Sequence, residues 1–338
     1  MSNPSQIRRV VGVLALAAAV LTLTACGGST ALPGEPGGPP APTSAPPPVV
    51  QTTGVSPSAA TPTGSGTPVV VIPSATSASA TASGSGDSGS SAPRGSASGN
   101  HPAALVSSFP SLQARLSGPA GVAIVPVGGA GKPVVLGKLQ TGAAWSTAKV
   151  PLAIAALGSA ASASSGDVRR AIIASDNEAA DRLWHRIGGG QQAASAVDKV
   201  LRAGGDAVTL TQPAVVRPPY SAFGQTSWAL TNQASFAAHL PCMASGTQVL
   251  GLMRQVDGGQ QWGLYRLGGA AIKGGWGPSS GSGYLVRQLG VLPVEGGQLG
   301  VAIMVDSPGG FESGVRDLNV ITDWLQANRA ALPAGGNC

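Results

Sequence analysis

The 338-residue sequence has little charge and few aromatic side chains. Charged residues make up 10% of it and aromatic residues 4%. Residues 27–100 hold no aromatic residue and only three charged ones, Glu35, Asp87 and Arg94. A stretch of this composition cannot bury enough apolar surface to offset the entropy of an ordered chain. We therefore expect residues 27–100 to be disordered and residues 101–338, which hold every aromatic residue, to form a single globular domain.

Other scarcities exclude whole classes of protein. No apolar run outside the N-terminus reaches the length of a membrane span, which excludes a polytopic membrane protein. Three cysteines are too few for a fold built on disulfides. The net charge of residues 101–338 is +5, but apart from Arg169 and Arg170 their basic residues are scattered, whereas a nucleic-acid-binding protein usually presents a basic stripe. We expect no nucleic-acid partner, no metal site and no cofactor.

The N-terminus has the pattern of an export signal. Arg8 and Arg9 precede a 16-residue apolar stretch that ends in small residues. The sequence around Cys26, LTACG, resembles the bacterial lipobox, which implies cleavage before Cys26 and a lipid on its thiol. We expect residues 1–25 to be a lipoprotein signal peptide and residues 26–100 a lipidated, disordered tether on the outer face of the cell membrane. The alternative is ordinary secretion with a chance cysteine.

Two cysteines remain in the domain, Cys242 and Cys338. Export places them in an oxidising compartment, where an even pair predicts a disulfide. Such a bond would join the C-terminus to the middle of the domain. The alternative is one buried thiol and one free terminal thiol.

Hydrophobic periodicity predicts an α+β fold. The expected order is helix, two strands, a long helical segment, three strands and a closing helix. This order favours a five-stranded antiparallel sheet flanked by helices, with an all-helical lobe beside it. Active sites often lie in the cleft between two such lobes. We expect helices at 102–116 and 312–327, strands at 121–127, 133–139, 270–273, 284–293 and 298–306, and a mostly helical segment at 146–256.

A serine and a lysine three residues apart are the first candidate for catalysis. Ser146 and Lys149 lie at the expected start of a helix, where positions i and i+3 share one face. A serine needs a nearby base to attack a carbonyl carbon, and a lysine held neutral can serve. A helix N-terminus also favours developing negative charge. Alone the pattern is weak, because it arises by chance in a chain rich in Ala and Ser.

A second triplet, Ser175-Asp176-Asn177, stands before an expected helix at residues 178–187. It offers a hydroxyl, a carboxylate and an amide close together. Ser and Asp are also common N-cap residues, so an ordinary helix cap is the alternative interpretation.

A third pattern, Lys273-Gly274-Gly275-Trp276, follows an apolar strand. Two glycines on a strand permit close approach of a ligand or another backbone. A lysine entering such a site would place positive charge beside an anionic substrate. The alternative is a surface lysine before a glycine turn.

Together and in this order, the three patterns resemble those of the serine β-lactamase and penicillin-binding (DD-peptidase-like) superfamily. In particular, the sequence resembles the β-lactamase-related lipoproteins of actinobacteria. The resemblance covers residues 101–338 and implies the fold of that superfamily. It also implies acyl transfer through a serine, with a cell-wall peptide or a β-lactam as the substrate.

The resemblance implies a role for each motif residue. Ser146 would be the nucleophile and Lys149 its base, while Ser175 would pass a proton to the leaving nitrogen. Asn177 would hold the substrate amide and orient Lys149, and Lys273 would attract the substrate carboxylate and tune Ser175. The backbone N–H groups of Ser146 and Trp276 would form the oxyanion hole. Further substrate-binding positions are Gly274, Gly275 and Arg287, the last as a second anchor for a carboxylate.

The sequence departs from the superfamily pattern in three places. Gly274 stands where a Thr or Ser usually follows the lysine, so the hydroxyl that would bind the substrate carboxylate is missing. The step from Ser146 to Ser175 is short, which indicates a trimmed helical lobe. The stretch 206–217, where the resemblance would place a deacylating Glu, contains none. We therefore expect acylation by a β-lactam without efficient turnover.

Three functions remain open on this sequence. The leading expectation is an exported, membrane-tethered serine hydrolase that forms an acyl-enzyme at Ser146. The second is a non-catalytic protein that uses the same cleft to bind peptidoglycan or a protein partner. The third is an esterase of the same fold, for which the missing hydroxyl at Gly274 would matter less.

Overall fold

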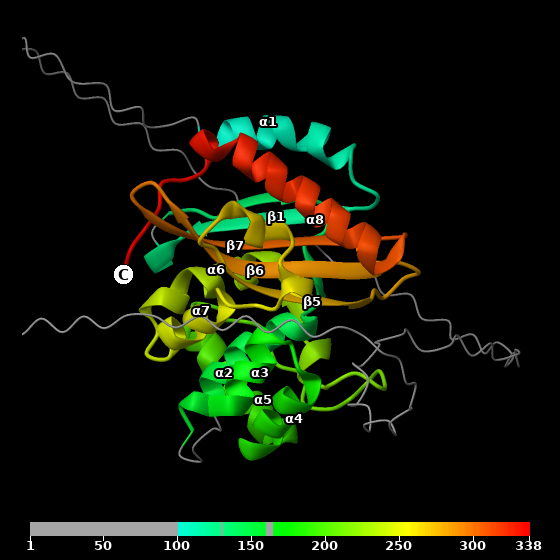
Figure 1. Ribbon diagram of the computed structural model, residues 1–338, viewed down its shortest axis with the longest axis vertical. Helices are drawn as coiled ribbons and strands as arrows, with labels where there is room; N and C mark the ends of the chain where they lie inside the picture. Colours follow the sequence, from blue (N-terminus) through cyan, green and yellow to red (C-terminus); the bar gives the residue numbers. More distant parts are fainter. Residues whose placement is uncertain (1–100, 130, 160–164) are drawn as a thin grey trace, which may run out of the picture. The chain divides into compact units, whose positions relative to one another are not determined.

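The computed structural model describes residues 101–129, 131–159 and 165–338 (Figure 1). These residues form a five-stranded sheet with helices on both faces and a helical lobe below it. The expected α+β architecture is confirmed. The expected signal peptide, lipidated Cys26 and linker lie outside the described residues. Within those residues, no helix combines the length and apolar character needed to cross a membrane.

The sheet has the order β2-β1-β7-β6-β5, and each neighbouring pair is antiparallel. Its inner strands are nearly continuous runs of buried residues, because helices cover both of their faces. β5 lies at one edge and therefore has backbone groups that no sixth strand satisfies. The strands are β1 (Ala120–Pro126), β2 (Val134–Gly137), β5 (Ala271–Pro278), β6 (Tyr284–Val294) and β7 (Gly297–Ser307).

Two terminal helices cover one face of the sheet, α1 (His101–Gln113, cyan) and α8 (Gly310–Ala327, red) (Figure 1). α8 places an apolar face on β6 and β7. Phe109 of α1 packs edge-on against Trp324 of α8, with ring centroids 5.9 Å apart. The two ends of the domain therefore stabilise each other.

The other face carries α6 (Leu230–His239) and the helical lobe. The lobe contains α2 (Lys149–Leu157), α3 (Ser165–Ile173), α4 (Asn177–Arg186), α5 (Gly190–Ala203) and α7 (Gly246–Met253). Its core is rich in alanine, which lets these short helices approach one another closely. A two-stranded sheet, β3 (Thr141–Ala143) with β4 (Ser227–Ala229), connects the lobe to the main sheet region.

The structure differs from the expected elements in two places. β5 is longer than expected, because pairing with β6 continues through Gly274 and Gly275 as far as Pro278. Glycine has a low strand propensity, so its presence hides this half of the strand in the sequence. β3 and β4 were not expected at all, since three residues are too few to show a period of two.

A disulfide joins Cys242 to Cys338, with Cα atoms 5.4 Å apart. A small bridge holds the same C-terminal segment, because Gln298 and Gly336 exchange backbone hydrogen bonds of 2.9 and 3.0 Å. The C-terminus is therefore fastened at two points.

Candidate active site

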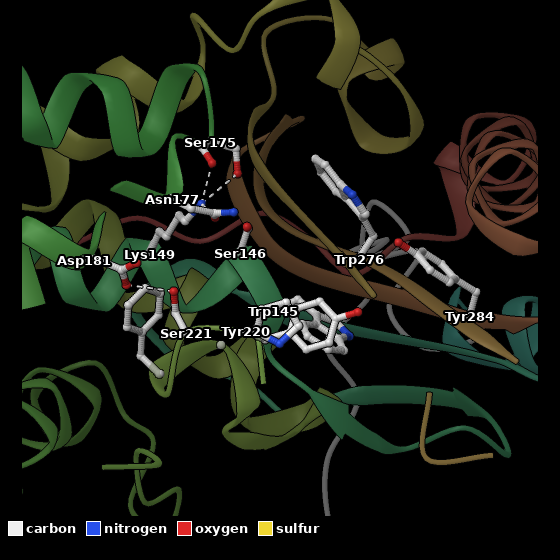
Figure 2. A pocket seen from close by; sticks show the side chains of 13 residues that line it. Trp145, Ser146, Lys149, Ser175, Asn177, Asp181, Tyr220, Ser221, Trp276 and Tyr284 are labelled. Atoms are coloured by element: carbon white, nitrogen blue, oxygen red, sulfur yellow. Dashed lines mark hydrogen bonds between the residues drawn. The ribbon is translucent and has the colours of Figure 1, made fainter. Parts of the chain in front are cut away.

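A pocket of about 340 Å³ lies where the first turn of α2, the start of α4, strand β5 and the segment 219–224 meet (Figure 2). It brings together five of the expected site residues, Ser146, Lys149, Ser175, Asn177 and Trp276. The complete lining is Trp145, Ser146, Lys149, Ser175, Asn177, Asp181, Pro219, Tyr220, Ser221, Phe223, Gly224, Trp276 and Tyr284.

Ser146 sits in a 3-10 turn, Trp145–Ala148, that runs directly into α2. Its hydroxyl makes no hydrogen bond with another described residue, and it points toward the ends of Lys149 and Asn177 (Figure 2). The preceding residue, Trp145, has a φ of 48°, a left-handed conformation that non-glycine residues rarely adopt. This conformation persists because the Trp145 ring is buried and packs edge-on against Tyr220, with centroids 5.0 Å apart.

Lys149 is almost completely buried, with 1% of its surface exposed. Its Nζ donates to the Ser175 carbonyl oxygen (2.5 Å), to Ser175 Oγ (3.3 Å) and to Asn177 Oδ1 (2.7 Å). Burial lowers the pKa of this amine to about 7, although the carboxylates of Asp176 and Asp181 act to raise it. A substantial fraction of Lys149 is therefore neutral near pH 7, as a general base requires.

Ser175 and Asn177 are held in place at the start of α4. Asp176 is the N-cap of that helix and accepts a 2.9 Å hydrogen bond from the Ala179 N–H. The cap interpretation of this triplet is thus correct for Asp176, while its two neighbours face the pocket. Ser175 itself has a φ of 56°, so it too occupies the left-handed region.

Lys273 approaches Ser175 from strand β5. Its Nζ donates to Ser175 Oγ (2.9 Å), to Gln260 Oε1 (3.0 Å) and to the Gly274 carbonyl oxygen (3.0 Å). Complete burial and the nearby Lys149 ammonium hold the pKa of Lys273 well below its usual value. Because Ser175 Oγ accepts hydrogen bonds from both lysines, its own O–H points away from the two Nζ atoms.

Gly275 allows β5 to approach the turn that carries Ser146. A Cβ atom at this position would lie 3.0 Å from the Ser146 nitrogen and 2.9 Å from the Thr147 nitrogen. Any side chain here would push the strand away from Ser146. The close approach places the backbone of β5, and Trp276 with it, along the wall of the pocket beside Ser146.

Gly274 faces an indole ring. A Cβ atom at this position would lie 3.0 Å from Cζ2 and Cη2 of Trp262. Trp262 is buried, donates from Nε1 to the Gly259 carbonyl oxygen (3.0 Å), and packs edge-on against Trp276 and Phe311. The space above Gly274 is therefore aromatic, and the ring leaves no room for a hydroxyl there without a shift of Trp262.

The expectation that Arg287 anchors a substrate carboxylate is wrong. Arg287 is completely buried and does not line the pocket. Its guanidinium donates hydrogen bonds to acceptors inside the protein. They reach Gln233 Oε1 and three backbone carbonyl oxygens, those of Gly142, Ala143 and Trp228, at 2.8 to 3.3 Å. Gln233 in turn donates to Thr147 Oγ1 (2.9 Å), so Arg287 supports the turn that carries Ser146.

The stretch 206–217, where the resemblance would place a deacylating Glu, does not line the pocket. Asp206 is fully buried and structural, accepting hydrogen bonds from Trp228 Nε1 (2.8 Å) and from the backbone of Thr209 (3.0 Å). The loop reaches the pocket only at Pro219, Tyr220 and Ser221.

Asp181 is the one carboxylate among the described residues that line the pocket. It accepts a 2.7 Å hydrogen bond from Ser221 Oγ. Asp181 was not among the residues predicted from the sequence, although it follows Asn177 by four residues and so lies on the same helix face. Gln260, which binds Lys273 across a loop, was not predicted either and has no local signal in the sequence.

The fold is similar to that of solved β-lactamases. No model of a known protein family matches the sequence, and no curated protein matches it. Among solved structures, the β-lactamase of Sphaerobacter thermophilus is similar with a TM-score of 0.50 and 19% identity, over 67% of this chain and 97% of that one. A β-lactamase of Xanthomonas campestris pv. campestris is similar with a TM-score of 0.51 and 15% identity, over 68% and 98%. At these identities the likeness establishes the fold, and the chemistry rests on the site.

Proposed function

We propose that this protein is an exported serine hydrolase that forms an acyl-enzyme at Ser146 with a cell-wall peptide or a β-lactam. The observation that carries the proposal is the environment of Lys149. A buried lysine with a pKa of about 7, near a serine hydroxyl that makes no hydrogen bond within the described part of the chain, is the pairing that nucleophilic catalysis needs.

The side chains can carry the proton transfers that acylation of Ser146 requires. Neutral Lys149 takes the proton of Ser146 Oγ as that oxygen bonds to the carbonyl carbon of the substrate. The negative charge on the carbonyl oxygen is met by the N–H groups of Ser146 and Trp276. The tetrahedral intermediate collapses, and the bond to the leaving nitrogen or oxygen breaks. The proton on Lys149 passes through Ser175 Oγ to that leaving atom, and Lys149 is neutral again.

The supporting residues divide into two groups. Asn177 fixes Lys149 through Oδ1 and keeps its amide N–H₂ for a carbonyl group of the substrate. Lys273 and Gln260 hold Ser175 Oγ from the other side, which orients its proton toward the pocket. The lipobox around Cys26 leads us to propose a lipid anchor on the outer face of the cell membrane, with residues 26–100 as the tether.

A serine-directed fluorophosphonate tests the nucleophile. Intact-mass analysis of the domain is expected to show one added phosphonyl group, mapped to Ser146 by peptide sequencing. Ser146→Ala, shown to be folded by circular dichroism, should remain unlabelled. Labelling of wild type and variant alike, or of neither, would overturn the proposal.

The second candidate is a non-catalytic protein that binds peptidoglycan or a protein partner in the same cleft. The observations that favour it are Gly274 and the lack of a glutamate among the described pocket residues. Two strained residues and two lysines buried against one hydroxyl argue for catalysis, because a binding cleft requires none of these features. An esterase of the same fold would use the same nucleophile and is separated from a peptidase by its substrates.

A further inference from the structure

The pocket offers no cation that is free to bind an anion. Lys149 is the one cation among the described lining residues, and its Nζ donates to three acceptors. Lys273, behind it, also donates to three. Even as an ammonium group, with three N–H donors, neither lysine keeps one for a substrate, and a neutral amine has one donor fewer.

Neither Arg287 nor Arg217 lines the pocket. Arg287 is buried against backbone carbonyl groups and does not reach the pocket. Arg217 lies at the rim, where its guanidinium stacks 5.9 Å from the centroid of Trp145 and 6.0 Å from that of Tyr220. Its Nη1 donates to the Pro278 carbonyl oxygen (3.0 Å), so it connects the loop to the end of β5.

The groups that do face the pocket disfavour an anion. Asp181 contributes a carboxylate to the lining. A substrate carboxylate would have to lose water beside this charge without gaining a cationic partner, which is costly. The space above Gly274 is covered by Trp262 and so lacks a hydroxyl that could take the place of water. Much of the remaining lining is aromatic, from Trp145, Tyr220, Phe223, Trp276 and Tyr284.

We infer that the pocket selects acyl donors that carry no carboxylate near the scissile bond, such as neutral esters and amides whose carboxyl group is itself esterified or amidated. This inference rests on the proposed acyl-enzyme at Ser146. Applied to a cell-wall peptide, it means attack at an internal amide rather than beside a free terminal carboxylate. For a β-lactam, the inference means that the free acid acylates Ser146 more slowly than its ester.

Two matched pairs of compounds test the inference. Benzylpenicillin is compared with its methyl ester, and 4-nitrophenyl hydrogen succinate with 4-nitrophenyl acetate. The measurement is the second-order rate of acylation of Ser146, followed by intact mass and, for the esters, by release of 4-nitrophenol. We expect the neutral member of each pair to acylate at least tenfold faster, after correction for its rate with Ser146→Ala. Equal rates, or faster reaction of the acids, would overturn the inference.

The outcomes separate the inference from the proposed function. If the fluorophosphonate labels Ser146 but neither pair reacts, the nucleophile stands and the inference is overturned. If the fluorophosphonate also fails, the proposed function falls.

Two variants locate the cause of the selectivity. The double variant Gly274→Ser with Trp262→Ala removes the ring and adds a hydroxyl, and should raise the rate of the acid relative to the ester by about tenfold. Arg217→Gln should leave that ratio unchanged, because Arg217 does not line the pocket. A selective tenfold loss with the acids in Arg217→Gln would make Arg217 a carboxylate anchor and overturn the inference.

Discussion

Trp145 and Ser175 are the two non-glycine residues with positive φ in the described part of the chain, and both line the same pocket. They come from segments 30 residues apart in sequence, one before the nucleophile and the other at the start of α4. Left-handed backbone costs a non-glycine residue free energy that the surrounding packing must offset. The two strained residues flank the side chains that would carry out acyl transfer.

A comparison of two substitutions at Ser175 tests this backbone conformation. Ser175→Ala and Ser175→Gly both remove Oγ, and both should lose most of the acylation rate. Glycine adopts a φ of 56° freely and alanine does not. Ser175→Gly should therefore be more stable than Ser175→Ala by about 1 kcal/mol in urea unfolding. At a position with an ordinary helical or extended φ, the order of stability would be the opposite, with the Ala variant more stable than the Gly variant.

The protonation of Lys149 predicts the pH dependence of acylation. Its pKa is lowered to about 7, chiefly by burial, and the base must be neutral to accept the Ser146 proton. The rate of reaction with a neutral substrate should therefore rise as pH increases from 5 and level off above about 7. Asp181 acts to raise this pKa, so Asp181→Asn should move the rising limb to lower pH. If the rate of the variant rises at the same pH as that of the wild type, a group other than Lys149 controls the rate.

The buried position of Arg287 predicts that its loss affects stability first. Arg287→Ala would remove a donor from four acceptors, at about 1–3 kcal/mol for each that is left without another donor and that water cannot reach. We expect a loss of at least about 2 kcal/mol in the free energy of unfolding. Arg287→Lys keeps the charge but cannot span the same acceptors, so it should be destabilised as well. If Arg287→Lys kept full stability and lost only the reaction with carboxylate-bearing substrates, the structural role would be wrong.

Much of the fold could be predicted from the sequence because periodicity is a local property. The strands at 284–294 and 297–307 and the closing helix carry enough apolar residues at the right spacing to be located within about two residues. Ser146 and Lys149 were similarly expected where a helix begins, and the structure has Ser146 in the 3-10 turn that runs into α2 and Lys149 as the first residue of α2.

The contacts between distant segments could not be predicted in this way. Lys273 and Ser175 are 98 residues apart, and only the folded chain shows that one donates to the other. Arg287 illustrates the reverse case. Its charge on a strand near the lysine motif indicated a substrate anchor, but its partners are backbone carbonyl groups on β3 and β4, two strands too short to be recognised.

The disulfide between Cys242 and Cys338 closes a segment of the chain with a sequence separation of 96 residues. A crosslink of this span restricts the unfolded chain, with a maximal effect of about 4–5 kcal/mol. Replacing both cysteines by alanine should lower the free energy of unfolding by about 2–5 kcal/mol. The bridge between Gln298 and Gly336 should keep the C-terminal segment in place in the folded state. Acylation at 25 °C should then be unchanged, and a parallel loss of activity would show that the disulfide shapes the pocket.

The composition of the pocket also predicts slow release of the acyl group. Attack by water on the acyl-enzyme needs a base near the ester carbonyl, and the described lining supplies Lys149 and the single carboxylate Asp181. Asp181 is engaged by Ser221 Oγ at 2.7 Å. A dedicated general base typically contributes about 10²–10⁴-fold, so deacylation should be slower than acylation by about that factor. With a chromogenic ester, the trace should show a burst equal to the enzyme concentration followed by a slow steady state. The acyl adduct should persist in intact-mass spectra for minutes, whereas rapid linear turnover without a burst would mean that Lys149 or Asp181 activates water efficiently.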